Sequence, residues 1–409
     1  MKKTLISLCC LLLAIPFAFA GCGDNESSAQ ETTAKPTQPT TAATQPATTK
    51  PVETTAPATA DSAMPDEGDV TYDSFEIKKN LNDIESSIGN ILTKNDFKGS
   101  MYVKIGNDFD YISSKGAASK GAHIDNSIYS THYVGSATKL VTAIAVMKLV
   151  EEKKIDLNSS IEKYFPKCYY AKSITVKQLL TMTSGIPDYV QREQNPGQSM
   201  MLVPELDKII TDADDGKNNK KTVLNWILSQ KPVKSGDSEF AYSDSNYFLL
   251  GEIIASASKQ DYASYVKDTV FKKSLISKSG FSNDALTASS YPSNPKAEKL
   301  CYSGVGYASL GMISNVSDVL RLIDSLMSHN IISEKSVKEM FTDYGNGFGY
   351  GVYVSGNRVY CLGQIDSFSS KISFTTDQSI MYIAMSNYAE TDINLIHRLF
   401  KNYMAKYRN

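Results

Sequence analysis

The segment Ser136-Ala137-Thr138-Lys139 places a hydroxyl and an amine three residues apart. If the segment is helical, these two side chains lie on one face, about 5–6 Å apart. A lysine there can accept the serine proton only as a neutral amine, and burial in an apolar helix lowers a lysine pKa in that direction. The helix N-terminus also lends partial positive charge to a nearby oxyanion. Ser136 and Lys139 are therefore a candidate nucleophile and base.

The same Ser-x-x-Lys spacing occurs five times, starting at Ser136, Ser160, Ser256, Ser264 and Ser293. For any one of them the plainer interpretation is a solvated serine and a solvated lysine. Only the first follows an aromatic residue and a glycine, in Tyr133-Val134-Gly135, and it alone opens a long apolar run, Leu140–Val150. This context favours Ser136 over the other four.

The segment YVGSATKLVTAIAVMKLVEEKKIDLNSSIEKYFP resembles the active-site region of the serine β-lactamase and penicillin-recognising superfamily. It is most similar to the class C-like branch of D,D-peptidases, class C β-lactamases and related esterases. Further segments similar to this branch follow in the right order: Leu179–Tyr189, Phe240–Ile254, Gly311–Leu322 and a terminal hairpin. The resemblance covers roughly residues 75–405. It implies a β-lactamase/transpeptidase-like fold and hydrolysis through an acyl-enzyme on a serine.

The second motif of that branch is Tyr-x-Asn, and Tyr242-Ser243-Asp244 occupies its place. The resemblance implies that Tyr242 relays the serine proton, either as phenolate or through Lys139; the alternative is a tyrosine packed in the core. Asp244 departs from the pattern. A carboxylate only accepts hydrogen bonds, and it favours the charged form of Lys139, which makes the lysine a poorer base. Asn246 lies too far along the chain to replace it.

The third motif is usually Lys or His, then a small residue, then Gly, on an edge strand. The register of Ser367–Ser370 puts Cys361-Leu362-Gly363 in that place. Gly363 fits, because an edge strand close to substrate needs no side chain there. The backbone amides of Ser136 and Gln364 are the expected oxyanion hole. The expected substrate-binding residues are Asp244, Cys361 and Gly363. A neutral Cys361 thiol does not neutralise a substrate carboxylate. Cys361 can instead be interpreted as a small strand residue without a role in binding, or as a second nucleophile.

The spacing of apolar residues and of turn residues along the chain predicts an α+β fold. Apolar residues at helical spacing between Ile77 and Leu92 open the domain, and a last helix is expected from about Asp392 to Tyr403. A hairpin is expected around Gly106-Asn107-Asp108. Further strands are expected at Tyr350–Val354, Arg358–Leu362, Phe368–Phe374 and Ile380–Ser386. The simplest packing is one antiparallel sheet flanked by the first and last helices, with a mostly helical lobe from about residue 155 to 345 and the site between the lobes.

The N-terminal residues indicate export and anchoring. Lys2 and Lys3 precede an apolar run, Leu5–Ala20, and Phe19-Ala20-Gly21-Cys22 resembles the lipobox of bacterial lipoproteins. We expect a signal peptide over residues 1–21 and a lipid on Cys22, at the extracytoplasmic face of the membrane; the alternative is an ordinary signal peptide cut near Ala20. Residues 31–60 contain 11 Thr, 7 Ala and 5 Pro, which predicts a disordered tether over 22–70 before the 71–409 domain.

Composition excludes several classes of function. The net charge of −2 offers no basic field for nucleic acid. No apolar run after residue 22 approaches 18 residues, so no transmembrane helix is expected. The spacing of Cys and His suggests no metal site, and no cofactor is expected. We expect a monomeric, membrane-anchored serine hydrolase acting on a cell-wall peptide or a small ester. The alternative is a weak or inactive member that binds or regulates at the cell envelope, which Asp244 and Cys361 favour and the intact Ser136, Lys139 and Tyr242 oppose.

Overall fold

A computed structural model describes residues 81–192, 200–212, 216–233 and 239–405. The predicted signal peptide, Cys22, the predicted tether and Ile77 lie outside these ranges. Within them the chain folds as α+β, which confirms the predicted fold class.

The centre of the fold is an antiparallel sheet, six-stranded among the described residues, with the order β2-β1-β12-β11-β10-β9. Its strands are β1 (Gly99–Ile105), β2 (Phe109–Lys115), β9 (Tyr353–Ser355), β10 (Arg358–Ile365), β11 (Phe368–Thr375) and β12 (Ile380–Ser386). β1 pairs with β12 from Ser100↔Met385 to Ile105↔Ile380, so the two ends of the domain share one sheet. This is the joining that the sequence pattern predicts.

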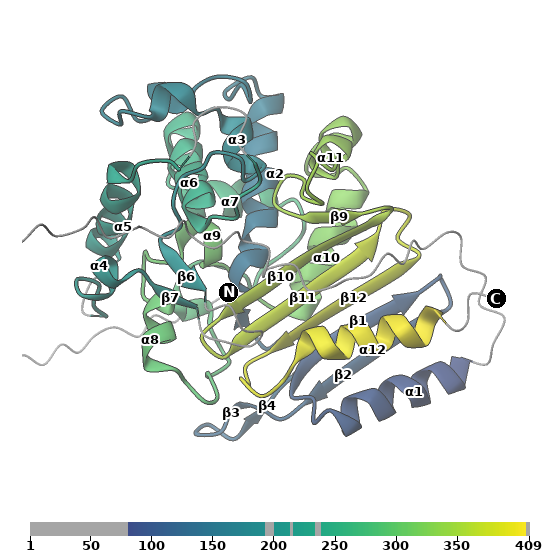
Figure 1. Cartoon of the computed structure of the whole chain (residues 1–409). Coiled ribbons are helices and arrows are strands. Elements are labelled where there is room, and N and C mark those ends of the chain that lie inside the picture. The colour runs from purple at the N-terminus through teal and green to yellow at the C-terminus, as the bar shows by residue number, and fades with distance from the viewer. Residues whose placement is uncertain (1–80, 193–199, 213–215, 234–238, 406–409) are drawn as a thin grey trace, which may run out of the picture. The chain divides into compact units, whose positions relative to one another are not determined.

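Helices α1 (Leu81–Lys94) and α12 (Ile393–Ala405) cover one face of this sheet, as Figure 1 shows. Their apolar residues form a core with the sheet residues that point to the same side. Its members include Ile84, Ile88, Leu92, Met101, Val103, Tyr382, Ile396 and Phe400. Burial of these side chains fixes the register of β1 against β12, because a one-residue slip would turn the apolar set away from the helices.

The helical lobe packs on the opposite face (Figure 1). Its helices are α2 (Thr138–Glu151), α3 (Val176–Leu180), α4 (Pro204–Asp207), α5 (Lys217–Ser229), α6 (Asp244–Ser258), α7 (Tyr262–Val266), α8 (Pro295–Glu298), α9 (Tyr307–Leu310), α10 (Val316–Met327) and α11 (Glu334–Met340). Most of α2 is buried, from Thr138 through Met147, which explains why its sequence is apolar on every side. None of the helices in the described ranges is both long enough and apolar enough to cross a membrane.

The described residues also form three short strand pairs outside the central sheet. They are β3 (Ala117–Ser119) with β4 (Ile124–Asp125), β5 (His132–Tyr133) with β8 (Ile313–Ser314), and β6 (Val190–Arg192) with β7 (Met200–Leu202). The sequence pattern does not predict these strands, because two or three residues are too few to show an alternating period. Of the six, β6, β7 and β8 lie within the segment from about residue 155 to 345 that the pattern predicts as mostly helical. Two of the pairs, β5–β8 and β6–β7, flank the candidate site.

Candidate active site

Ser136 lies in a single 3-10 turn, Gly135–Ala137, immediately before α2. Gly135 adopts a φ of 53°, and a Cβ there would lie 2.7 Å from the Gln364 nitrogen and 2.8 Å from the Gln364 oxygen. Only glycine combines that φ with so close an approach to β10. The serine side chain stays partly exposed, so its hydroxyl is accessible while its backbone is held against the sheet.

Hydrogen bonds from both parts of the fold hold this turn. The Val134 nitrogen donates to the Met312 oxygen at 3.0 Å, and the Met312 nitrogen donates to the Thr138 hydroxyl at 3.0 Å. On the sheet side, the Ser370 hydroxyl of β11 donates to the Val134 oxygen at 2.8 Å. The serine therefore lies where the helical lobe meets the sheet, the place that the sequence predicts for the site.

Lys139, in the first turn of α2, is 1% exposed and is directed at the serine. Its Nζ donates to Ser136 Oγ at 3.0 Å and to the Ser309 carbonyl oxygen at 3.1 Å, and it forms an ion pair with Asp244. Burial lowers the pKa of Lys139 below its ordinary value; the Asp244 carboxylate opposes this shift, and the Arg192 guanidinium adds to it. A buried amine with a lowered pKa, in contact with a hydroxyl, can act as a general base.

The other Ser-x-x-Lys segments have no such environment. Their lysines, Lys163, Lys259, Lys267 and Lys296, are all exposed. None of these four lysines lies in an apolar environment like that of Lys139. Burial of the lysine, which the spacing alone does not reveal, is what separates Ser136 from the other four serines.

Tyr242 lies beside this pair, just before α6. The Lys139 Nζ is 5.1 Å from the centre of its ring, and Phe348 packs edge-on at 6.3 Å. Burial raises the pKa of Tyr242 and Asp244 raises it further, whereas Arg192 and hydrogen bonding with the Ser136 side chain lower it. The net shift favours the protonated phenol. Of the two relay routes that the sequence leaves open, transfer through Lys139 is the one that this environment favours.

Asp244 is fully buried at the start of α6 and contacts Lys139. Its two carboxylate oxygens pair with different cations, Lys139 and Arg192. Burial raises its pKa, but the two cations and their hydrogen bonds hold it below the ordinary value, so the group is ionised. Asn246 has a separate role, since its side-chain oxygen accepts a hydrogen bond from Ser184.

Arg192 and Asp188 are site residues that the sequence does not single out. The Arg192 guanidinium pairs with Asp188 through one nitrogen and with Asp244 through another, and its carbon lies 4.8 Å from the centre of the Tyr242 ring. Asp244 stands where the second motif usually has an asparagine amide, and a buried carboxylate there implies a nearby cation. The chain holds 42 lysines and arginines, however, and no spacing in the sequence indicates which of them pairs with Asp244.

The edge of β10 completes the site. Its neighbour β9 pairs with it only from Arg358 to Tyr360, so residues 361–365 of β10 adjoin the serine turn. A Cβ at Gly363 would lie 1.8 Å from the Val134 oxygen and 2.4 Å from Ser370 Oγ, which leaves no room for any side chain there. The Gln364 amide lies next to Gly135, where it and the Ser136 amide can both approach one substrate oxygen.

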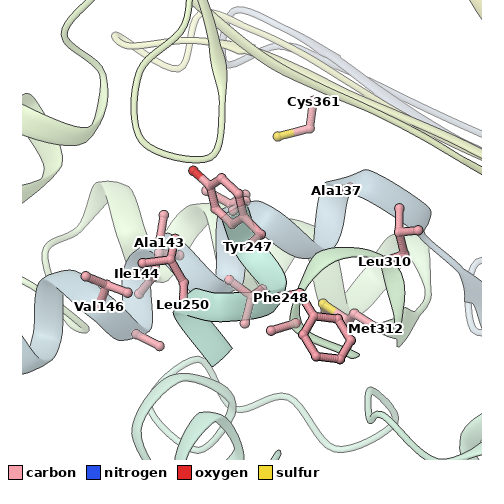
Figure 2. Close-up of a cluster of buried hydrophobic side chains, with 14 of the residues drawn as sticks. Ala137, Ala143, Ile144, Val146, Tyr247, Phe248, Leu250, Leu310, Met312 and Cys361 are labelled. Atoms are coloured by element: carbon pink, nitrogen blue, oxygen red, sulfur yellow. The ribbon is translucent and has the colours of Figure 1, made fainter. Parts of the chain in front are cut away.

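Cys361, expected as a substrate-binding position, is 3% exposed and belongs to the core between the sheet and the lobe. Figure 2 draws it with the buried cluster that contains Ala137, Tyr247 and Met312. Its thiol donates to the Gly351 oxygen at 3.7 Å, and burial raises its pKa to about 12. A buried, protonated thiol offers substrate neither a charge nor a contact surface, and it is a poor nucleophile. The environment therefore favours the alternative of a small strand residue.

The site is one of acid–base and nucleophilic groups. Within the described ranges, no three His, Cys, Asp or Glu side chains gather in a way that suits a metal ion. The groups that do converge are a hydroxyl, a buried amine, a phenol and a pair of backbone amides, the set needed to attack a carbonyl carbon and stabilise the resulting oxyanion.

Comparison with known proteins gives consistent results. The family model described as Beta-lactamase matches residues 112–397. The putative penicillin-binding protein PbpX of Bacillus subtilis is 26% identical over 319 residues, which cover 75% of this chain and 74% of that protein. Two solved structures share the fold. A penicillin-binding protein from Bacillus halodurans has a TM-score of 0.66 and 21% identity, over 78% of this chain and 98% of that one. D-amino acid amidase from Ochrobactrum anthropi SV3 has a TM-score of 0.65 and 17% identity, over 80% of this chain and 100% of that one.

Proposed function

Because this chain belongs to the beta-lactamase family, within the superfamily of serine β-lactamases and penicillin-binding proteins, we propose that it hydrolyses an ester or amide through an acyl-enzyme on Ser136. The observation that carries the proposal is the 3.0 Å hydrogen bond from the buried Lys139 Nζ to Ser136 Oγ. No other Ser-x-x-Lys segment of the chain has a buried lysine.

The geometry of the site supports the following reaction. Ser136 Oγ attacks the substrate carbonyl carbon while its proton passes to a neutral Lys139. The carbonyl oxygen becomes an oxyanion held by the amides of Ser136 and Gln364. The tetrahedral intermediate collapses, the leaving group takes the proton from Lys139 by way of Tyr242, and the acyl group remains on Ser136. Water then attacks the ester carbonyl, gives up a proton to the same base, and releases the acid and the free serine.

The residues in place of the third motif indicate which substrate charge the cleft can bind. With Cys361 buried, that position brings no cation to the cleft, so we expect substrates that do not depend on a carboxylate held there. Short esters meet this condition, and cell-wall peptides remain the second class. The name of the Bacillus subtilis relative, putative penicillin-binding protein PbpX, supports the cell-wall class.

The proposal includes secretion and anchoring through Cys22. The lipobox-like residues Phe19–Cys22 precede a Thr/Pro/Ala-rich stretch that cannot form a core. As a coil of about 45 residues it would average about 40 Å and reach about 140 Å when extended. Expressed in a bacterium, the wild-type chain should take up radiolabelled fatty acid and the Cys22→Ala variant should not. If the wild-type chain takes up no label, the domain has no lipid anchor at Cys22.

A substrate panel tests the hydrolase proposal. Wild-type protein and Ser136→Ala are compared on p-nitrophenyl esters of short acids, a D-Ala-D-Ala peptide and a chromogenic cephalosporin. We expect the short esters to be cleaved fastest and every activity to vanish in Ser136→Ala. Efficient cephalosporin cleavage would contradict the account of position 361. If the wild-type protein cleaves nothing while it binds a cell-wall fragment, the chain is a binding protein instead.

A further inference from the structure

Arg192, at the end of β6, connects two carboxylates from different parts of the helical lobe. It pairs with Asp188, four residues earlier, and with Asp244 at the start of α6. The Asp244 side chain is fully buried, and those of Asp188 and Arg192 are 15% and 26% exposed. A guanidinium group suits this place, because its planar fork can serve two carboxylates at once, whereas a lysine ammonium is a single point of charge.

The ion pair alters the charge next to the catalytic lysine. Asp244 alone would stabilise the Lys139 ammonium and so weaken Lys139 as a base. Arg192 binds the second oxygen of the same carboxylate and places a positive charge nearby. The sum of the Asp244 and Arg192 charges is zero, which is the charge of an asparagine side chain.

We propose that Arg192 is a positioning residue for hydrolysis: by pairing with Asp244 it cancels the carboxylate charge, so that the two side chains together take the place of a neutral amide beside Lys139. The inference rests on the function proposed above, because it concerns the base of that reaction. Arg192 has no hydrogen bond to Ser136 or Lys139 in the described structure, so it acts through Asp244.

Asp188 holds the arginine in this position. Its Oδ1 accepts the backbone N–H groups of Val190 at 3.1 Å and Asp244 at 3.0 Å, while Oδ2 pairs with Arg192. One carboxylate thus ties the start of β6 to the start of α6 and fixes the direction of the guanidinium. Burial raises the pKa of Asp188 to about 6, against the opposing effect of Arg192.

Several titratable groups other than Arg192 face Lys139 or its partners, and a pH experiment must take them into account. They come from the loop before β6, from α6 and its approach, from β9 and from β10. The groups are Asp188, Tyr189, Tyr242, Asp244, Tyr247, Tyr353 and Cys361. The tyrosines and the cysteine have raised pKa values, so Asp188, Asp244 and Arg192 are the charged neighbours at neutral pH.

A double-mutant cycle tests the proposal in the full-length protein. Wild type, Arg192→Met, Asp244→Asn and the double variant are assayed for kcat/KM on one short ester from about pH 5 to 10, with Ser136 labelling by a fluorophosphonate as an independent readout. In Arg192→Met the uncompensated Asp244 raises the Lys139 pKa. The acidic limb of the profile should then move up by about one unit and activity at neutral pH should fall about tenfold. In Asp244→Asn the limb should move down.

The double variant decides between a positioning role and a merely structural one. The summed charge at positions 192 and 244 is again zero, as in wild type, so its acidic limb should return to within a few tenths of a unit of wild type, and its rate should exceed that of Arg192→Met. A limb that does not move in Arg192→Met, or a double variant no better than Arg192→Met, overturns the proposal. Should Arg192→Met fail to fold, the downward shift in Asp244→Asn carries the test, and its absence overturns the proposal.

Two further comparisons complete the design. Arg321→Met, which removes an exposed arginine on α10, should leave the profile unchanged. If the wild-type protein does not label at Ser136, the proposed function itself fails. If wild type labels but the cycle shows no coupling, only the role of Arg192 fails.

Discussion

In its protonated form Lys139 is the ion-pair partner of the Asp244 carboxylate, and the two side chains are 2% and 0% exposed. Both charges have left water, and each depends on the other and on Arg192 or Ser309 for compensation. Such a pair adds little stability compared with an apolar core, yet removing one partner leaves the other charge buried without compensation. The site is therefore sensitive to the loss of any single charged side chain.

Asp244→Ala should destabilise the domain by about 3–5 kcal/mol, because it leaves two cations beside an empty space. Urea unfolding followed by circular dichroism measures this free energy. The control is Glu334→Ala, which breaks the exposed Lys338–Glu334 pair on α11 and should change stability far less, because water screens an exposed ion pair. Equal losses in the two variants would contradict a buried ion pair between Lys139 and Asp244.

Gly363→Ala should damage the serine turn, since the new methyl group would overlap the Val134 oxygen and the Ser370 hydroxyl. Overpacking of this kind costs about 1–3 kcal/mol, and here it also displaces the backbone that leads to Ser136. We expect at least a tenfold slower reaction with a fluorophosphonate. Gly121→Ala is the matched control, because a Cβ there meets nothing within 4 Å. A Gly363→Ala variant that labels at the wild-type rate would contradict the close approach of β10 to the turn.

The sequence predicts much of the fold because long periodic segments dominate it. The sheet joining β1 to β12 and the covering helices α1 and α12 follow from apolar spacing and from turn residues such as Gly106-Asn107-Asp108. The short strands β5, β6 and β8 lack any such signal, and they form only because distant residues meet.

The site likewise contains residues that sequence motifs predict and residues that no motif indicates. Ser136, Lys139 and Tyr242 stand in motifs, and the structure brings them together. Arg192 stands in no motif and is defined by its three-dimensional proximity to Asp244, 52 residues along the chain. The burial of Cys361 likewise depends on Gly351 and Tyr247, which no local pattern connects to it.

His132→Gln should make the domain less sensitive to acid. His132 on β5 is fully buried beside Phe368, and burial lowers its pKa to about 4. Between an unfolded pKa of about 6.5 and this value only the unfolded chain binds the proton, so stability falls as pH falls, by up to about 3 kcal/mol. In urea unfolding at about pH 7 and pH 4.5, His132→Gln should lose less stability than wild type. The exposed His329→Gln serves as control, and equal losses in all three proteins would contradict a buried neutral imidazole.

Cys361 should resist alkylation in the folded protein. Its thiol is buried and its pKa is raised to about 12, so almost no thiolate exists at about pH 8. Iodoacetamide treatment followed by peptide mass spectrometry should find Cys361 unmodified in the native protein and modified after unfolding in urea. Rapid modification of the native protein would place the thiol in the cleft and make position 361 a substrate contact.

The central claim is that Ser136, activated by Lys139, is the nucleophile, and covalent trapping tests it most directly. Wild type, Ser136→Ala and Ser256→Ala are treated with a fluorophosphonate, and the labelled peptide is identified by mass spectrometry. Ser256 belongs to a Ser-x-x-Lys segment whose serine and lysine are both exposed on or next to α6. We expect label on Ser136 in wild type and in Ser256→Ala, and none in Ser136→Ala. Label that survives in Ser136→Ala, or a wild-type protein that labels only elsewhere, would contradict it.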